Sequence, residues 1–222
     1  AMSDVAACES DPDGSYRANV ELPVMLARAA AEVGAKLVAF SSDQVYTGLP
    51  GTGPFDETVD VHPTCIYGRH KREAEERVLD LLPSAVFLRA TWMYDLPSYG
   101  LPTRPKFLTN LLFSTLRHRP VSLSVREYRG ITYVRDVTAR LPAAADLPGG
   151  VYNFGSENDK TTYKTAEILC ARAGLFCTVL PDMAAPARTL AIYGSKARAA
   201  GSDFPKTADG LLRALDDYGI RF

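Results

Sequence analysis

The sequence is poor in cysteine and has no long apolar run, and each shortage excludes a class of protein. The chain of 222 residues contains four cysteines and no Cys-x-x-Cys pair; they are Cys8, Cys65, Cys170 and Cys177. Disulfide-stabilised secreted domains use cysteine more densely, so we expect reduced thiols in a cytoplasmic protein. No apolar stretch approaches the ~18 residues of a membrane span, and the first residues do not resemble a signal peptide.

A strong net charge is lacking as well. The 25 basic and 26 acidic side chains leave a formal charge of −1. We therefore expect no strong attraction to nucleic acid or to an anionic membrane. The three histidines do not have the spacing of zinc ligands, so we predict no structural metal.

A glycine-rich phosphate loop is also missing. Gly48, Gly51 and Gly53 lie close together, but Pro54 follows them. A dinucleotide-binding fingerprint needs a strand, the glycines and then a helix. We interpret this segment as a loop rich in turns.

Helices and strands alternate in the first half of the chain. Residues 15–33 predict a helix with a kink or a late start near 19–21, caused by Pro23, and Gly34 is expected to end it. Residues 36–42 and 85–90 are short apolar runs typical of buried parallel strands. Between these two strands, residues 65–82 carry apolar side chains at helical spacing and predict a helix. This order predicts an α/β fold with a parallel sheet.

The second half is less regular. We predict a loop at 97–105, helices at 106–118, 134–145, 161–173 and 206–218, and strands at 121–125, 151–154 and 176–180.

Hydroxyl and carboxyl side chains end the first predicted strand, at Ser41, Ser42 and Asp43. In open α/β sheets, ligands bind outside the carboxyl ends of the strands. These side chains can therefore reach a ligand, although an ordinary Ser/Asp turn is the alternative.

Tyr67 and Lys71 are four residues apart on a predicted helix and so share one face. An ammonium group beside a phenol favours the phenolate and lowers the phenol pKa, and such a tyrosine can give a proton to a carbonyl oxygen. The alternative is an exposed helix pair. Trp92, the only tryptophan, comes just after the second strand, where it either packs in a core or forms the wall of a substrate site.

Seven segments in order carry a family resemblance, namely 1–9 (AMSDVAACE), 16–20 (YRANV), 40–48 (FSSDQVYTG), 63–75 (PTCIYGRHKREAE), 88–94 (LRATWMY), 130–137 (GITYVRDV) and 150–155 (GVYNFG). Together they resemble the dTDP-4-dehydrorhamnose reductases of the extended short-chain dehydrogenase/reductase family. The resemblance implies a Rossmann-like parallel sheet in residues 1–96 and a smaller α/β substrate-binding lobe in 97–222, with 150–173 returning to the Rossmann domain.

The resemblance begins only at the family's fourth strand, so we expect the family's N-terminal strands and glycine-rich βαβ units to be absent from these 222 residues. A shortened sheet would expose a strand edge and apolar helix faces. We therefore expect that these 222 residues alone neither fold stably nor bind NADPH.

The implied reaction is reduction of the 4-keto group of a nucleotide-linked deoxysugar, with NADPH or NADH as cofactor. Ser42 would hydrogen-bond the keto oxygen, Tyr67 would be the general acid, and Lys71 would hold the nicotinamide ribose and depress the pKa of Tyr67. Other cofactor contacts would come from Ala1, Ser41 and Thr91. Substrate contacts would come from Met2, Asp43, Gln44 and Trp92, and from Arg188 at the diphosphate.

Departures from the family pattern keep other functions open. Gln44 replaces a usual tyrosine, Cys65 an asparagine and Ile131 a proline, and the segment after Arg188 matches poorly. One alternative is a non-catalytic relative such as the regulatory subunit of methionine adenosyltransferase, although Trp92 argues against it. Another is a different sugar-nucleotide reductase or an epimerase. A dehydratase is disfavoured, because such enzymes have Thr-Asp-Glu where this chain has Ser-Asp-Gln. The resemblance also leaves room for a homodimer.

Overall fold

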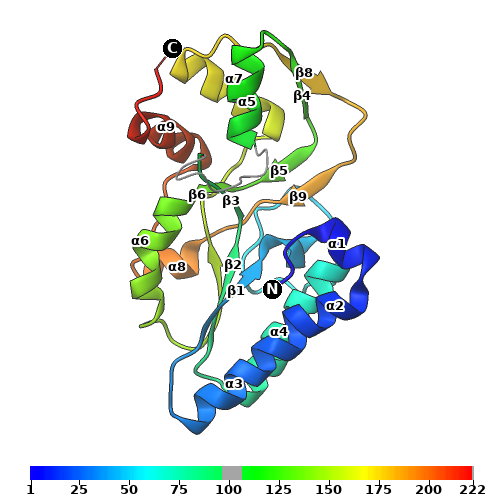
Figure 1. The fold of residues 1–222 in the computed structure, drawn as a ribbon, viewed down its shortest axis with the longest axis vertical. Helices are drawn as coiled ribbons and strands as arrows, with labels where there is room; N and C mark the ends of the chain where they lie inside the picture. Colours follow the sequence, from blue (N-terminus) through cyan, green and yellow to red (C-terminus); the bar gives the residue numbers. More distant parts are fainter. Residues whose placement is uncertain (97–106, 222) are drawn as a thin grey trace.

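A parallel three-stranded sheet forms the centre of the lower lobe in the computed structural model, which describes residues 1–96 and 107–221 (Figure 1). Its order is β1 (Val38–Ser42), β2 (Val86–Ala90) and β7 (Gly150–Phe154). Every residue of the central strand β2 is buried, as in parallel sheets that are covered on both faces. The predicted α/β fold and both strands of the first half are confirmed.

Helices cover the two faces of this sheet (Figure 1). On one face lie α3 (Leu22–Glu32) and α4 (Ile66–Leu81), whose Ala27 and Val78 pack with Phe87 of β2. On the other face lie α6 (Val134–Ala144) and α8 (Ser195–Ala199), and Val137 of α6 packs with Leu88. Successive side chains of a strand point to opposite faces, which explains why Phe87 and Leu88 belong to different clusters.

The N-terminal region is helical from Val5 onward. Helix α1 (Val5–Ser10) is capped by Asp4, and α2 (Pro12–Tyr16) continues into the π-helical segment η1 (Arg17–Glu21) and then α3. The irregularity that Pro23 was expected to cause takes the form of this π-helical turn. Pro23 itself is the second residue of α3. Because the helical stretch continues from η1, the missing N–H of Pro23 cannot supply the usual i→i−4 hydrogen bond there. Gly34 follows the helix with φ +66°, a conformation that glycine adopts without strain.

The upper lobe packs three helices on short strand pairs. The helices are α5 (Phe107–Leu116), α7 (Thr162–Ala173) and α9 (Thr207–Asp217). The strands pair in parallel as β3 (Trp92–Tyr94) with β6 (Ile131–Tyr133), β4 (Val121–Ser124) with β8 (Val179–Asp182), and β5 (Glu127–Arg129) with β9 (Arg188–Leu190). Leu108, Leu111, Leu169 and Leu211 lie in its apolar core.

The strand predicted at 176–180 is placed too early, because β8 covers Val179–Asp182. Strands β3, β5, β6 and β9 were not predicted, since three residues are too few to show periodicity. The predicted loop at 97–105 falls outside the described residues.

The division of the chain between the lobes remains a proposal. Strand β7 joins the lower sheet through β2, whereas α7 contacts α9, β8 and β4 of the upper lobe. We propose that the chain crosses to the upper lobe at β3, just before the expected boundary at residue 96, and returns to the lower sheet at α6, ahead of β7.

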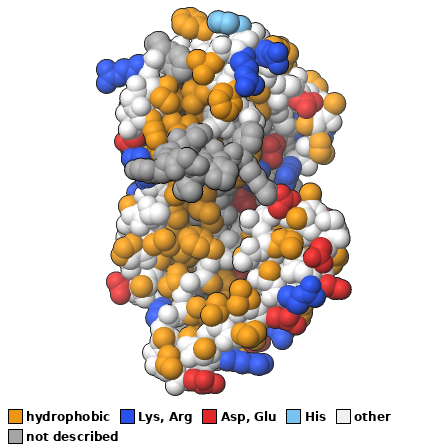
Figure 2. All heavy atoms as spheres, in the orientation of Figure 1, with side chains coloured by type: hydrophobic (Ala, Val, Ile, Leu, Met, Phe, Trp, Pro, Cys, Tyr) orange, Lys and Arg blue, Asp and Glu red, His pale blue; other side chains and the backbone are white. Residues whose placement is uncertain are grey.

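Apolar side chains lie exposed on the lower lobe (Figure 2). Leu22, Met25 and Leu26 of α3 are 43%, 64% and 51% exposed, and in the described residues β1 pairs with β2 alone. The expectation that the chain alone does not fold stably remains a prediction. No helix in residues 1–96 and 107–221 is long and apolar enough to span a membrane.

Candidate active site

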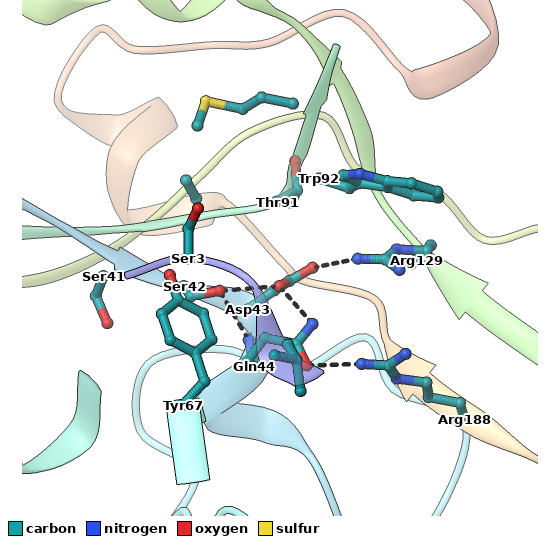
Figure 3. A pocket seen from close by; sticks show the side chains of 13 residues that line it. Ser3, Ser41, Ser42, Asp43, Gln44, Tyr67, Thr91, Trp92, Arg129 and Arg188 are labelled. Carbon is teal, nitrogen blue, oxygen red and sulfur yellow. Dashed lines mark hydrogen bonds and ion pairs between the residues drawn. The ribbon is translucent and has the colours of Figure 1, made fainter. Parts of the chain in front are cut away.

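A pocket of about 530 Å³ lies where the carboxyl ends of β1 and β2 meet strands β5 and β9 (Figure 3). Side chains from both lobes surround it. Its lining residues are Ser3, Val5, Ser41, Ser42, Asp43, Gln44, Tyr67, Ala90, Thr91, Trp92, Met93, Arg129 and Arg188. The pocket occupies the position at which open α/β sheets bind ligands.

Ser42 ends β1 and caps the 3₁₀ helix η2 (Asp43–Tyr46). Its Oγ accepts a 3.2 Å hydrogen bond from the backbone N–H of Gln44 and donates one of 3.2 Å to Asp43 Oδ1. The side-chain amide of Gln44 donates to the same Asp43 oxygen at 3.2 Å. This turn therefore fixes the Ser42 hydroxyl at the pocket wall.

Tyr67 lies in the first turn of α4, directly beside this turn. A Cβ at Gly68 would lie 2.4 Å from the carbonyl oxygen of Gln44, so only glycine allows the helix to start this close. Cys65 caps the helix, because its Sγ accepts a 3.3 Å hydrogen bond from the Gly68 N–H. The packing buries the Tyr67 phenol next to Ser42.

Burial raises the pKa of Tyr67 to about 12, and it outweighs the lowering effect of a hydrogen bond with Ser42. Lys71 lies one turn further along α4, with Nζ 5.7 Å from the centre of the Tyr67 ring, and donates a 3.0 Å hydrogen bond to the Phe40 carbonyl. Burial also lowers the pKa of Lys71. The pKa of Tyr67 is thus raised and not depressed as expected, and desolvation of the phenol is the largest cause. The phenol stays protonated at neutral pH, which is the form that a general acid needs.

Arg129 enters the pocket from β5 and contacts both Asp43 and Trp92. Its Nη2 lies 3.5 Å from Asp43 Oδ2, and its guanidinium carbon lies 4.4 Å from the centre of the Trp92 ring. Glu127 forms a second ion pair with Arg129 at 3.4 Å. Burial raises the pKa of Asp43, and the charge of Arg129 partly offsets that rise.

Arg188 reaches the same pocket from β9, the strand that pairs with β5. The register places Glu127 opposite Arg188. Arg188 Nη2 donates a 2.6 Å hydrogen bond to Gln44 Oε1, and its Nη1 lies 3.9 Å from Glu127. Figure 3 shows both arginines pointing toward the η2 turn from the upper lobe.

The pocket brings together most of the residues proposed from the sequence. Eight of them line it, namely Ser41, Ser42, Asp43, Gln44, Tyr67, Thr91, Trp92 and Arg188. Lys71 lies behind Tyr67 rather than at the surface of the pocket. Ala1 and Met2 do not line it; the Met2 carbonyl accepts a 2.9 Å hydrogen bond from Asn19, and Ser3 and Val5 line the pocket instead. Sequence reasoning missed Arg129, because nothing in a three-residue strand marks it as a pocket residue.

The residues around Tyr67 fit the ribose and amide end of a nicotinamide cofactor. Ser41 Oγ is buried and has no hydrogen-bond partner in the described part of the chain. Lys71 uses one N–H on Phe40, and an ammonium group has three. Thr91 is bonded to Thr132 through their hydroxyls. In residues 1–96 and 107–221, no group of three or more His, Cys, Asp or Glu side chains is arranged to hold a metal ion.

Residues 1–200 match the family model of the RmlD substrate binding domain. The chain belongs to this family. The resemblance drawn from the sequence motifs is thereby confirmed.

This RmlD-family chain is similar in sequence to dTDP-4-dehydrorhamnose reductases and to a methionine adenosyltransferase subunit. It is 33% identical over 179 residues to dTDP-4-dehydrorhamnose reductase of Mycobacterium tuberculosis. The aligned part covers 78% of this chain and 57% of that protein. It is 30% identical over 177 residues to methionine adenosyltransferase 2 subunit beta of Xenopus laevis, covering 76% of the chain and 50% of the relative. The chain thus spans little more than half the length of these relatives.

The structure of this RmlD-family chain also resembles structures that have been solved for other proteins. The crystal structure of dTDP-4-dehydrorhamnose reductase from Bacillus anthracis, in complex with NADP, superposes with a TM-score of 0.83 at 24% identity. The match covers 98% of this chain and 77% of that one. At this identity the likeness establishes the fold.

Proposed function

We propose that this chain is part of a reductase that uses NADPH or NADH to reduce the 4-keto group of a nucleotide-linked deoxysugar. One observation carries the proposal: the buried Tyr67 phenol lies beside the Ser42 hydroxyl at the pocket end of β1, with the Lys71 ammonium one helical turn away. A carbonyl oxygen placed between the two hydroxyls would meet two donors.

Reduction of a ketone needs a hydride on carbon and a proton on oxygen, and a bound reduced nicotinamide supplies the hydride. Ser42 would turn its hydroxyl from Asp43 Oδ1 to the keto oxygen and polarise the carbonyl. Tyr67 would give its proton to the same oxygen as negative charge develops there. Lys71 would stabilise the phenolate that remains.

The cofactor end of the pocket is formed by Ser41 and Tyr67, with Lys71 behind them. We propose that Lys71 binds the ribose hydroxyls with its remaining N–H groups and that the free Ser41 hydroxyl contacts the nicotinamide. NADP in the Bacillus anthracis relative supports a nicotinamide cofactor. Ala1 and Thr91 remain proposed cofactor contacts.

The substrate end of the pocket is formed by Trp92, Gln44 and Arg188. We propose that Arg188 contacts the diphosphate, since a guanidinium can donate two parallel hydrogen bonds to phosphate oxygens. Trp92 and Gln44 would contact the sugar, and Met2 remains a proposed contact.

The same proposal includes a cytoplasmic location, supported by four free cysteines, and a homodimer.

The test is oxidation of NADPH by the full gene product that contains these residues, with dTDP-4-keto-6-deoxy-L-mannose as substrate. Tyr67→Phe removes only the phenolic hydroxyl and should lower kcat by about 10²- to 10⁴-fold. Equal rates for the wild type and Tyr67→Phe would overturn the role of Tyr67 as the acid.

A non-catalytic regulatory role is the second candidate, favoured by the 30% identity to methionine adenosyltransferase 2 subunit beta. The same assay separates the two. A regulatory protein would show no turnover in the wild type and would form a complex with a catalytic subunit, which a pull-down with that subunit would detect.

A further inference from the structure

Besides Ser41 Oγ, two buried polar atoms of the pocket lack hydrogen-bond partners in the described residues, one acceptor and one donor. The acceptor is Asp43 Oδ2, which has only the 3.5 Å ion pair with Arg129 Nη2, and the donor is Arg129 Nε. Both residues line the pocket, at 3% and 8% exposure. Buried polar groups are nearly always satisfied in native proteins, so an unsatisfied pair in one pocket needs an explanation.

The surroundings hold these two side chains in place. Trp92 stacks on the Arg129 guanidinium, and Glu127 pairs with its Nη1. Ser42 and Gln44 both donate to the other oxygen of Asp43. Oδ2 and Nε are therefore oriented before any ligand arrives, and Figure 3 shows Arg129 facing Asp43 beneath the indole.

The charges around the pair disfavour an anionic ligand at this point. Arg129 has two carboxylates within ion-pair distance, Asp43 and Glu127. Arg188, by contrast, is hydrogen-bonded to the neutral amide of Gln44, and its nearest carboxylate contact is 3.9 Å away. A phosphate is therefore better matched to Arg188, whereas a neutral group is better matched to the Asp43–Arg129 pair.

A hydroxyl group donates and accepts at one oxygen atom and so can satisfy both members of the pair. We infer that Asp43 and Arg129 together bind one hydroxyl of the sugar ring and thereby select hydroxylated over deoxygenated sugars. This inference rests on the proposed nucleotide-sugar substrate and adds the part of the sugar that is recognised. A site built to bind a hydroxyl discriminates against the analogue that lacks it, because its own polar groups then stay buried and unpaired.

The experiment measures binding rather than turnover, so that it does not depend on the catalytic residues. Titration calorimetry compares a dTDP-6-deoxyhexose with its 2-deoxy and 3-deoxy analogues on the full gene product. We expect one deoxy analogue to bind about 10- to 100-fold more weakly than the parent compound. Equal affinities for all three compounds would overturn the inference, and no binding of any of them would overturn it together with the proposed substrate class.

Two variants test whether the pair is responsible. Arg129→Lys keeps the charge but removes Nε–H, and Asp43→Asn replaces one carboxylate oxygen by a donor. In each variant the difference in affinity between the parent compound and the deoxy analogue should fall to less than about threefold. The reason is that the variant can no longer both accept from and donate to the hydroxyl. The matched control Arg188→Lys should weaken all three compounds by the same factor and leave the discrimination intact.

A purely structural role for Arg129 predicts a different result. In that case Arg129→Lys would weaken the three compounds equally, and the inference would fail. Circular dichroism and affinity for free dTDP show whether each variant is folded. Turnover of the 4-keto substrate by the wild type is measured separately, so a protein that discriminates without turnover contradicts only the proposed reduction.

Discussion

Gln44 accepts a 2.6 Å hydrogen bond from Arg188 although 144 positions separate the two residues in the chain. Gln44 belongs to the turn after β1 in the lower lobe, and Arg188 to strand β9 in the upper lobe. The bond crosses the pocket that both lobes line. It therefore couples the position of the proposed diphosphate contact to the turn that carries Ser42.

Replacement of Gln44 should weaken binding of the nucleotide more than it slows the chemistry. Gln44→Leu keeps a similar volume but removes the acceptor, so Arg188 loses its fixed orientation. We expect KM for the sugar nucleotide to rise about 3- to 10-fold, as for loss of a hydrogen bond to a charged group, with little change in kcat. Steady-state kinetics measure both constants. A drop in kcat at unchanged KM would contradict a positioning role for Gln44.

The buried ion pair between Arg89 and Glu75 should be essential for stability. Arg89 Nε and Nη2 donate to the two Glu75 oxygens at 3.0 and 2.7 Å, and Nη1 donates to the Tyr46 hydroxyl at 2.9 Å. Arg89→Met leaves the Glu75 carboxylate buried without its partner, which costs about 3–5 kcal/mol of unfolding free energy. Urea denaturation of the full gene product measures the loss.

The double variant Arg89→Met/Glu75→Met is the control for that measurement. It removes both charges, so no carboxylate remains buried without its cation, and it should recover most of the stability. If the double variant is as unstable as Arg89→Met, the loss comes from packing and not from the unpaired charge.

The sequence was sufficient for the sheet of the lower lobe, for α4 and α6, and for the centre of the site, whereas the short helices α1, α2 and α8 were not predicted. The long periodic helix α4 and the fully buried, mostly apolar strand β2 can be recognised from their residue patterns. Ser42 and Tyr67 meet because the strand end and the following helix share one edge of the sheet. Arg129 was missed because its position depends on the pairing of β5 with β9, two strands of three residues each. The direction of the Tyr67 pKa shift was also missed, since it depends on burial between the helix and the turn after β1.

Tyr67 should stay protonated well above neutral pH. Its pKa is raised by burial to about 12, compared with about 10 for a free tyrosine. Ultraviolet titration of the wild type minus Tyr67→Phe should therefore show no tyrosinate signal from Tyr67 below about pH 10. A signal that appears near pH 7 would mean that a nearby positive charge controls the phenol after all.

The same shift has a consequence for stability. A pKa that is raised in the folded state means that the folded protein holds the proton more tightly than the unfolded chain does. The contribution of Tyr67 is then fully present below about pH 10 and is lost as the pH rises to about 12. Urea denaturation at pH 9, 10 and 11 should show a steeper loss of stability for the wild type than for Tyr67→Phe above about pH 10.

Gly68 should tolerate no side chain, because the start of α4 depends on its contact with the turn after β1. An added Cβ would lie 2.4 Å from the Gln44 carbonyl oxygen and 2.9 Å from Pro63 Cβ. Gly68→Ala must push the helix away from that turn, which we expect to cost about 1–3 kcal/mol of unfolding free energy and to lower kcat, since Tyr67 moves away from Ser42. The matched control is Gly210→Ala in α9, where the nearest atoms would be 3.7 Å away. This control should stabilise the protein by about 0.5–1 kcal/mol through the better helix propensity of alanine. If Gly68→Ala gains stability as Gly210→Ala does and keeps the wild-type kcat, then close packing of the helix on the turn does not position Tyr67.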